Sequence, residues 1–211
     1  MPEGREIQVP WVHVPHSNSE LQERYNLWAD RYEHDMEELY GYTLPQRGAE
    51  TLARHLPDMN SLILDAGSGT GLVGEALGAF GYVRVVGIDL SPGMLEQAGR
   101  KGVYRELHQM TLGEALDFPS DSFDGVVSIG VLTTGHAPPS SLDELIRVTR
   151  PGGIIVFSMR RDTYEERGFR EKQEALEQEG VWILVEESPE FAGLPRGEPE
   201  TPHRIYTYRV A

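Results

Sequence analysis

The sequence feature that most constrains the fold is the stretch 61–74, Ser-Leu-Ile-Leu-Asp-Ala-Gly-Ser-Gly-Thr-Gly-Leu-Val-Gly. Its apolar run at 62–64 is typical of a strand that is buried on both faces of a parallel sheet. Glycines occupy every second position from 67 to 71, and residues suited to a helix continue from 72 to about 80. We therefore predict a strand, a glycine-rich turn and a helix, which bring bare backbone and a helix N-terminus up to a ligand.

The ligand of this turn can be read in two ways. Gly69-Thr-Gly71-Leu-Val-Gly74 matches the dinucleotide pattern G-x-G-x-x-G, although a single match of this kind is weak. The other interpretation includes Asp65, because a carboxylate just before the turn would repel phosphates and would suit a cationic, amino-bearing ligand. A turn without a ligand is the third possibility, which three alternating glycines disfavour.

Length and charge restrict the class of protein. A chain of 211 residues suits one α/β domain with a helical extension. The 34 acidic residues outnumber 19 basic ones, and the net charge of −15 argues against broad binding to nucleic acid or anionic membranes. Cysteine is absent, which excludes disulfides and thiolate metal sites, and no metal site is expected. Because the sequence has neither a long apolar run nor a signal-peptide pattern, we expect a cytoplasmic protein, possibly also nuclear.

A second acidic residue follows the next predicted strand. Residues 83–88 form that strand, and Asp89 comes 24 positions after Asp65 (89 − 65). An acid near this offset binds the ribose of an adenosine ligand, because a carboxylate accepts two hydrogen bonds from a cis-diol. The alternative is that Asp89 caps the helix that Ser91-Pro92 begins.

The first 57 residues predict a helical cap. Residues 1–17 look irregular, and one long helix is expected from Ser19 to about Gly41, followed by a second over 45–56. Tyr25, Trp28 and Tyr32 share one face of the first helix. They either pack in the core or roof a ligand pocket, where aromatic rings can contact a cation.

The remaining periodicities predict alternating strands and helices. Strands are expected over about 103–112, 122–129, 154–158, 181–185 and 203–210, and helices over 140–148 and 163–179, with a loop at 188–203. We predict that the last strand is an edge strand in an antiparallel final pair, because no helix separates it from its predecessor. A dinucleotide fold would instead end in another crossover.

Several motifs together resemble the class I S-adenosylmethionine (SAM)-dependent methyltransferases. They are Asp65-x-Gly-x-Gly-x-Gly71, Asp89-Leu-Ser-Pro-Gly-Met94, Gly113-Glu-Ala115, Phe123-Asp124, Pro151-Gly-Gly153 and Tyr25-x-x-x-Ala-x-x-Tyr32. The resemblance covers about 150 residues, from Tyr25 to Arg160 and beyond. More closely, 32–42, 71–77 and 130–136 look like the vertebrate methyltransferase-like family of the Williams–Beuren syndrome region. Glu114 stands where the superfamily often has Asp, and the loop before Phe118-Pro119 is shorter than usual.

The resemblance implies a fold and a set of contacts. The fold would be α/β and Rossmann-like, with a mostly parallel seven-stranded sheet, an antiparallel last strand, helices on both faces and an N-terminal helical extension. One domain would contain the cap at 1–57 and a core at 58–211. The cofactor would be SAM, with S-adenosylhomocysteine (SAH) as product, held by Tyr25, Tyr32, Asp65, Ala66, Gly67, Ser68, Gly69, Gly71, Asp89, Leu90, Met94, Gly113, Glu114, Ala115, Ser128 and Gly130.

The expected reaction is in-line attack of an acceptor on the SAM methyl group. The loop 130–136 should face that group, because ligands of open α/β sheets bind beyond the carboxyl ends of the strands. Trp28, Thr133, Thr134 and His136 are candidate substrate contacts, and His136 is the candidate base for an acceptor that arrives protonated. Surface or turn roles are the alternatives for these side chains. We expect a small-molecule or protein acceptor, with a non-catalytic SAM- or SAH-binding module as the alternative function and an NAD oxidoreductase disfavoured.

Overall fold

The computed structural model describes residues 17–211, so most of the stretch expected to be irregular lies outside the described residues. The elements are α2 (Asn18–Trp28), α3 (Tyr32–Asp35), the π-helix η1 (Met36–Tyr40), α4 (Leu44–His55), β1 (Ile63–Ala66), α5 (Leu72–Ala79), β2 (Val85–Asp89), α6 (Pro92–Arg100), β3 (Glu106–Gln109), β4 (Phe123–Ser128), α7 (Ser141–Val148), β5 (Thr149–Arg160), α8 (Arg161–Glu166), α9 (Phe169–Gln178), β6 (Trp182–Glu187), β7 (Phe191–Ala192) and β8 (Pro202–Val210). No helix within this range is long and apolar enough to cross a lipid bilayer.

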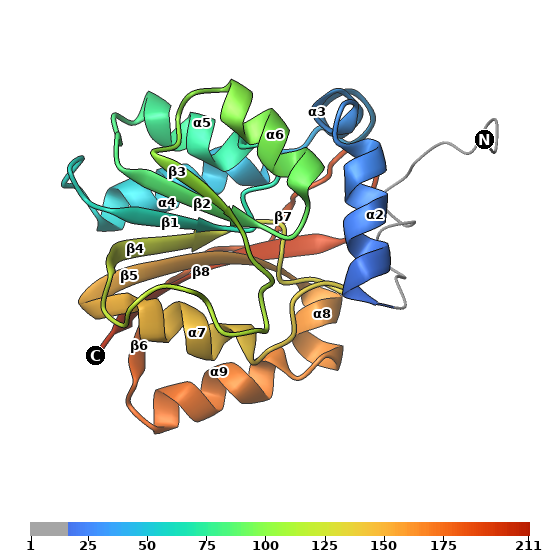
Figure 1. Cartoon of the computed structure of the whole chain (residues 1–211). Helices are drawn as coiled ribbons and strands as arrows, with labels where there is room; N and C mark the ends of the chain where they lie inside the picture. Colours follow the sequence, from blue (N-terminus) through green and yellow to red (C-terminus); the bar gives the residue numbers. More distant parts are fainter. Residues whose placement is uncertain (1–16) are drawn as a thin grey trace.

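A mostly parallel sheet forms the centre of the molecule (Figure 1). The strand order is β3-β2-β1-β4-β5-β8-β6, and the two-residue β7 pairs with β8. The first five strands of this order are parallel, whereas β8 runs antiparallel to both of its neighbours. The expected fold class, including the antiparallel last strand, is confirmed.

The position expected for the last strand is wrong. β8 lies between β5 and β6, so β6 forms the edge of the sheet. The stretch from Ile205 to Tyr208 is buried at every position, which is typical of an interior strand. Thr207, one of the polar residues that suggested alternation with solvent, lies inside the protein, whereas Arg209 is exposed.

Two hydrophobic cores lie on opposite faces of the sheet. Alternate residues of a strand point to opposite faces, so Ile63 and Leu64 belong to different cores. One core holds α4 and α5, through side chains such as Leu52 and Leu77. The other holds α7 and α9, through side chains such as Leu145 and Leu176. Both layers are visible in Figure 1.

The long N-terminal helix is interrupted, contrary to expectation. Ser17, not Ser19, caps α2, since its Oγ accepts a hydrogen bond from the backbone N–H of Glu20 at 3.2 Å. The helix ends at Trp28, whose indole Nε1 donates to Oδ2 of Asp35 at 2.9 Å, and both side chains are buried. This tertiary contact joins the two sides of the break and stabilises it.

Two further boundaries differ from the sequence prediction. The helix expected over 163–179 is divided into α8 and α9, because Gly168 between them adopts a φ of 79°. The loop expected over 188–203 contains the short strand β7, in which Phe191 pairs with His203.

The helix α2 lies at the carboxyl end of the parallel strands (Figure 1). It is joined to α6 through Asn26, whose Oδ1 accepts hydrogen bonds from Oγ of Ser91 at 2.7 Å and from the backbone N–H of Gly93 at 2.9 Å. The helix therefore covers the edge of the sheet where α/β folds bind ligands.

Candidate functional site

Gly67 and Gly69, in the turn after β1, differ in the space that surrounds their Cα atoms. Gly67 has a φ of 85°, and a Cβ atom there would lie 2.3 Å from Cγ2 of Val131. Gly69 has a φ of 52°, and a Cβ atom there would meet nothing within 4 Å. The backbone at Gly69 therefore faces open space, as a turn that admits a ligand requires.

Asp89 holds this turn in place. Its Oδ2 accepts a hydrogen bond from the backbone N–H of Gly69 at 2.8 Å, and its Oδ1 accepts one from Ser91 at 2.8 Å. Burial raises the pKa of the Asp89 carboxyl above its ordinary value, and these backbone hydrogen bonds oppose the rise. Ser91 is the N-cap of α6, since its Oγ accepts a hydrogen bond from the backbone N–H of Met94 at 3.1 Å, so the alternative in which Asp89 caps this helix is wrong. The Asp89 side chain borders the open space beside Gly69.

An open pocket adjoins Gly69 and Asp89. It encloses about 740 Å³ of empty space, counting solvent at its mouth. The predicted residues that line it are Tyr25, Tyr32, Gly67, Gly69, Asp89, Leu90, Met94, Gly130 and His136. Segments far apart in the sequence thus meet at one site, beyond the ends of β1, β2 and β4.

The other predicted cofactor residues do not line this pocket. They are Asp65, Ala66, Ser68, Gly71, Gly113, Glu114, Ala115 and Ser128. Ser128 supports the turn from below, since its Oγ donates to the carbonyl of Ala66 at 2.8 Å. The segment Gly113–Ala115 is exposed, although it directly follows three residues that line the pocket.

Sequence reasoning missed several lining residues. They are Asn18, Leu21, Ile88, Met110, Thr111, Leu112, Ile129, Val131 and Ala137. Met110–Leu112 follow β3 directly, so the rule that ligands bind beyond the carboxyl ends of strands could have found them, whereas Val131 lies within the loop 130–136 to which that rule was applied.

Asp65 lies buried beneath the turn. Its Oδ2 accepts a hydrogen bond from the hydroxyl of Tyr104 at 2.6 Å, and that hydroxyl accepts one from the backbone N–H of Gly74 at 3.2 Å. Within residues 17–211, Oδ1 of Asp65 is buried without a hydrogen-bond partner. Burial raises the pKa of Asp65 to about 7, the hydrogen bond from Tyr104 lowers it, and the charge of Asp89 raises it further.

Tyr25 and His136 close the roof of the pocket. The Tyr25 hydroxyl and Nε2 of His136 lie 2.7 Å apart, and Nδ1 of His136 lies 3.0 Å from the carbonyl of Thr134. A carbonyl only accepts, so the ring carries its proton on Nδ1 and Nε2 accepts from Tyr25. Burial lowers the pKa of His136 to about 4, so the ring is neutral at pH 7.

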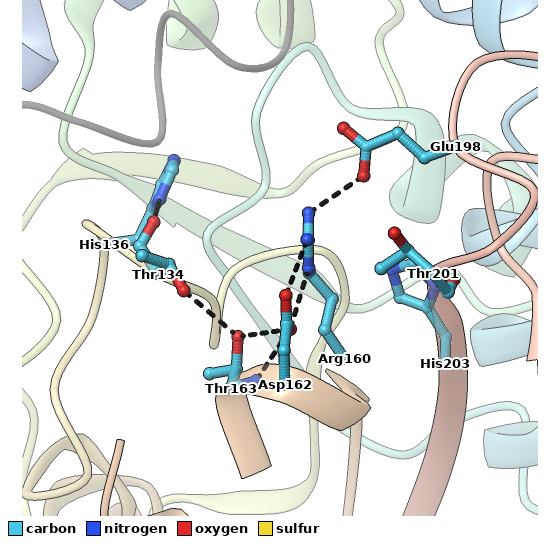
Figure 2. A network of polar contacts seen from close by, with 8 residues as sticks. All are labelled: Thr134, His136, Arg160, Asp162, Thr163, Glu198, Thr201 and His203. Atoms are coloured by element: carbon cyan, nitrogen blue, oxygen red, sulfur yellow. Dashed lines mark hydrogen bonds and ion pairs between the residues drawn. The ribbon is translucent and has the colours of Figure 1, made fainter. Parts of the chain in front are cut away.

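A second pocket adjoins the first. It encloses about 500 Å³ of empty space, counting solvent at its mouth, and shares Tyr25, Tyr32 and Gly130 with the first. Trp28 and Thr133 line it, whereas Thr134 lies aside, with its Oγ1 3.4 Å from Oγ1 of Thr163 (Figure 2). Of the predicted substrate contacts, His136 therefore lines the first pocket, Trp28 and Thr133 line the second, and Thr134 lines neither.

The donor and acceptor groups suit an adenosyl ligand with a cationic amino acid part. The open backbone at Gly69 admits close approach, the Asp89 carboxylate borders the space, and Asp65 lies buried nearby with an unpaired oxygen. Among the described residues, no group of three or more His, Cys, Asp or Glu side chains could hold a metal ion.

Comparison with known proteins agrees with this geometry. Residues 64–157, which include the glycine turn and Asp89, match a family described as "Methyltransferase domain". Over this range the chain is similar to methyltransferase domains. The human methyltransferase-like protein 27 is 39% identical over 165 residues, which are 75% of this chain and 66% of that protein. The chain thus spans just under two thirds of that relative's length, and the resemblance to methyltransferase-like proteins is confirmed.

Solved structures share the fold of this chain. The cyclase SpnF has a TM-score of 0.70 at 15% identity, covering 92% of this chain and 97% of that one. A putative methyltransferase in complex with the Trm112 methyltransferase activator, from Haloferax volcanii, has a TM-score of 0.62 at 18% identity, covering 88% and 97%. At these identities the likeness shows the fold alone.

Proposed function

We propose that this protein binds SAM in the first pocket and transfers its methyl group to an acceptor, most simply a small molecule. One observation carries the proposal: the open backbone at Gly69 and the Asp89 carboxylate border the same pocket at the carboxyl end of the sheet. When bound, SAM supplies an electrophilic methyl group. The chain's own task is then to align the acceptor and exclude water.

The residues at the pocket have separable roles in this proposal. Each oxygen of Asp89 has a second lone pair beyond the one that a backbone N–H uses, so the carboxylate can also accept from a ribose diol. Leu90 and Met94 would contact the adenine, and Tyr25 and Tyr32 would cover the cofactor. A direct role for Glu114 stays a prediction, because the described side chain is exposed.

His136 has a restricted place in this chemistry. Its Nε2 is engaged by the Tyr25 hydroxyl, so it can take a proton from an acceptor only where that acceptor displaces Tyr25. We therefore assign His136 first to holding Tyr25 over the pocket. The buried Asp35 is engaged elsewhere, since its carboxylate accepts hydrogen bonds from Trp28 and Arg31.

Calorimetry with SAM, SAH and NAD tests the binding site. We expect SAM and SAH to bind and NAD not to bind. Asp89→Asn keeps one acceptor oxygen and loses the charge, so SAH affinity should fall about tenfold to a hundredfold, or 1–3 kcal/mol. Asp117→Asn, at an exposed position outside both pockets, is the matched control. Unchanged SAH affinity in Asp89→Asn would remove Asp89 from the site.

Turnover separates the enzyme from a binding module that has lost its chemistry. Full-length protein is incubated with methyl-labelled SAM and a metabolite extract, and the label is followed by chromatography. We expect label in at least one extract compound, dependent on intact Asp89. Tight SAM binding without transfer to any fraction would favour the non-catalytic alternative.

A further inference from the structure

The second pocket has a largely apolar wall. Besides the shared Tyr25 and Tyr32, it is lined by Trp28, Met36, Tyr42, Leu44, Leu132 and Leu194. The ring centroids of Trp28 and Tyr32 are 4.8 Å apart and those of Tyr25 and Trp28 are 6.2 Å apart, so these rings support one another. Such walls suit a flat apolar body of small-molecule size.

Arg160 lines this pocket, and two carboxylates balance its positive charge. Arg160 donates to both oxygens of Asp162, at 3.1 and 2.8 Å, and to Oε2 of Glu198 at 2.9 Å (Figure 2). Two carboxylates therefore face one guanidinium. Arg160 offers no uncompensated positive charge that would attract an anionic ligand.

His203 presents an acceptor to the pocket. Arg160 of β5 and His203 of β8 are cross-strand partners, and both line the pocket. Only 4% of His203 is exposed, and its Nδ1 lies 3.1 Å from the carbonyl of Thr201. The proton therefore sits on Nδ1, and Nε2 keeps a lone pair to which no residue in the range 17–211 donates.

The surroundings of His203 keep the ring neutral. Burial and the nearby Arg160 lower the pKa of His203 to about 4, while the carbonyl of Thr201 and the charge of Asp162 oppose the shift. At pH 7 the ring is thus an acceptor at Nε2. A bound molecule that has an O–H or N–H group can meet it.

Thr133 supplies a second, independent sign of a ligand. It is 8% exposed, and its Oγ1 is buried without a hydrogen-bond partner among the described residues. It lines the same pocket as His203. Buried polar atoms are normally paired, so an unpaired hydroxyl that lines the same pocket as the Nε2 acceptor of His203 indicates a polar group that arrives with a ligand.

We propose that the second pocket holds the methyl acceptor, and that this acceptor is a small uncharged molecule with a flat apolar body and one O–H or N–H group that donates to Nε2 of His203. The inference rests on the proposed function, because the two pockets adjoin at Tyr25, Tyr32 and Gly130. His203 is then a substrate-binding residue of the same site.

Fluorine NMR with four matched probes tests the charge and donor requirement. Full-length protein is saturated with SAH, so that the first pocket is occupied, and is titrated with 4-fluorophenol, fluorobenzene, 4-fluorobenzoate and 4-fluorobenzylamine. We expect line broadening and saturable binding for 4-fluorophenol and at least tenfold weaker binding of the other three. Binding of the benzoate or the benzylammonium as tight as that of the phenol would overturn the inference.

Variants then locate the probe. His203→Asn retains an amide N–H for the carbonyl of Thr201 and removes the acceptor at Nε2, so 4-fluorophenol binding should weaken about tenfold while SAH affinity stays unchanged. His108→Asn, on β3 and outside both pockets, is the matched control. Thr133→Val removes the unpaired hydroxyl at nearly constant volume and should weaken the same probe without lowering the unfolding temperature.

The outcomes separate the two proposals. If SAH does not bind, the proposed function fails and this inference falls with it. If SAH binds and His203→Asn leaves 4-fluorophenol binding unchanged, only the inference is overturned. Should His203→Asn not fold, unchanged probe affinity in Thr133→Val overturns it instead.

Discussion

At the residue scale, the buried Asp65 and the partly buried Asp89 are two carboxylates that support one glycine turn with different partners. Asp89 accepts from two backbone N–H groups, whereas Asp65 accepts from a side-chain hydroxyl and leaves one oxygen unpaired. The pKa of both carboxyls is raised by burial, to about 7 for Asp65. Asp65 therefore changes its charge near neutral pH, which makes its contact with Tyr104 testable.

Tyr104→Phe should destabilise the protein more at pH 8.5 than at pH 5.5. A raised pKa in the folded state means that the stability contributed by protonated Asp65 is lost as pH rises through about 7. Loss of the Tyr104 hydroxyl raises that pKa further, so the penalty grows where the carboxyl must ionise. We expect a loss of about 1–2 kcal/mol in the free energy of unfolding at the lower pH and a larger loss at the higher pH.

Urea unfolding at the two pH values measures this difference. Tyr82→Phe is the control, because the Tyr82 hydroxyl donates to the backbone carbonyl of Leu56, which does not titrate. Equal losses at both pH values for Tyr104→Phe would show that the hydroxyl does not act through the Asp65 charge.

Some residues of the site could be predicted from the sequence, and others could not. The turn glycines, Asp89 and Gly130 were predictable because strand ends and glycine spacing are local signals. The pairing of Tyr25 with His136 was not, since the two are 111 positions apart and meet only after the sheet has formed. His203 was missed for the same reason, as its place beside Arg160 depends on how β8 pairs.

At the element scale, α2 is held over the pocket by polar contacts to two other elements and by a small hydrophobic cluster, in which its Leu21 and Trp28 pack with Met36, Tyr40 and Leu194. The hydrogen bond between Tyr25 and His136 joins it to the loop after β4, and Asn26 joins it to α6. Its surface side also carries Leu27, which is 73% exposed. Because this cluster is smaller than the two cores on the faces of the sheet, α2 is expected to open more easily than the sheet beneath it.

Tyr25→Phe should loosen this cover. Removing one hydrogen bond of about 0.5–1.5 kcal/mol should raise amide exchange across α2 by roughly threefold to tenfold and leave the strands of the sheet unchanged. Hydrogen–deuterium exchange with mass spectrometry reads both regions in one experiment. Leu27→Ala on the same helix is the control, and equal exchange in wild type and Tyr25→Phe would assign no holding role to the hydroxyl.

The bounds of helices and strands were predicted well where a local sequence pattern sets them, and poorly where tertiary contacts set them. The apolar runs of β1, β2 and β4 located the parallel strands to within a few residues. The break after Trp28 could not be read from an unbroken apolar face, because the buried contact with Asp35 stabilises it. The break at Gly168 did carry a signal, since glycine tolerates its left-handed conformation.

At the scale of the whole molecule, net charge limits the partners. With 34 acidic and 19 basic residues, the net charge of −15 should repel polyanions at long range. We predict no binding to short RNA or duplex DNA at about 0.15 M salt, and none on lowering the salt, because dilution lengthens the range of repulsion. Fluorescence anisotropy of labelled oligonucleotides measures this, and saturable binding that strengthens at low salt would reveal a basic surface.

The place of β8 between β5 and β6 affects how the protein is made. Residues 202–210 form β8 and leave the ribosome after β5 and β6, which flank β8 in the sheet. Until β8 has been made, one edge of β5 is unpaired and β6 cannot join the sheet. The open flank of β5 is the kind of surface on which nascent chains associate wrongly. Translation up to about residue 200 therefore leaves a vulnerable interval in which a chaperone would be of most use.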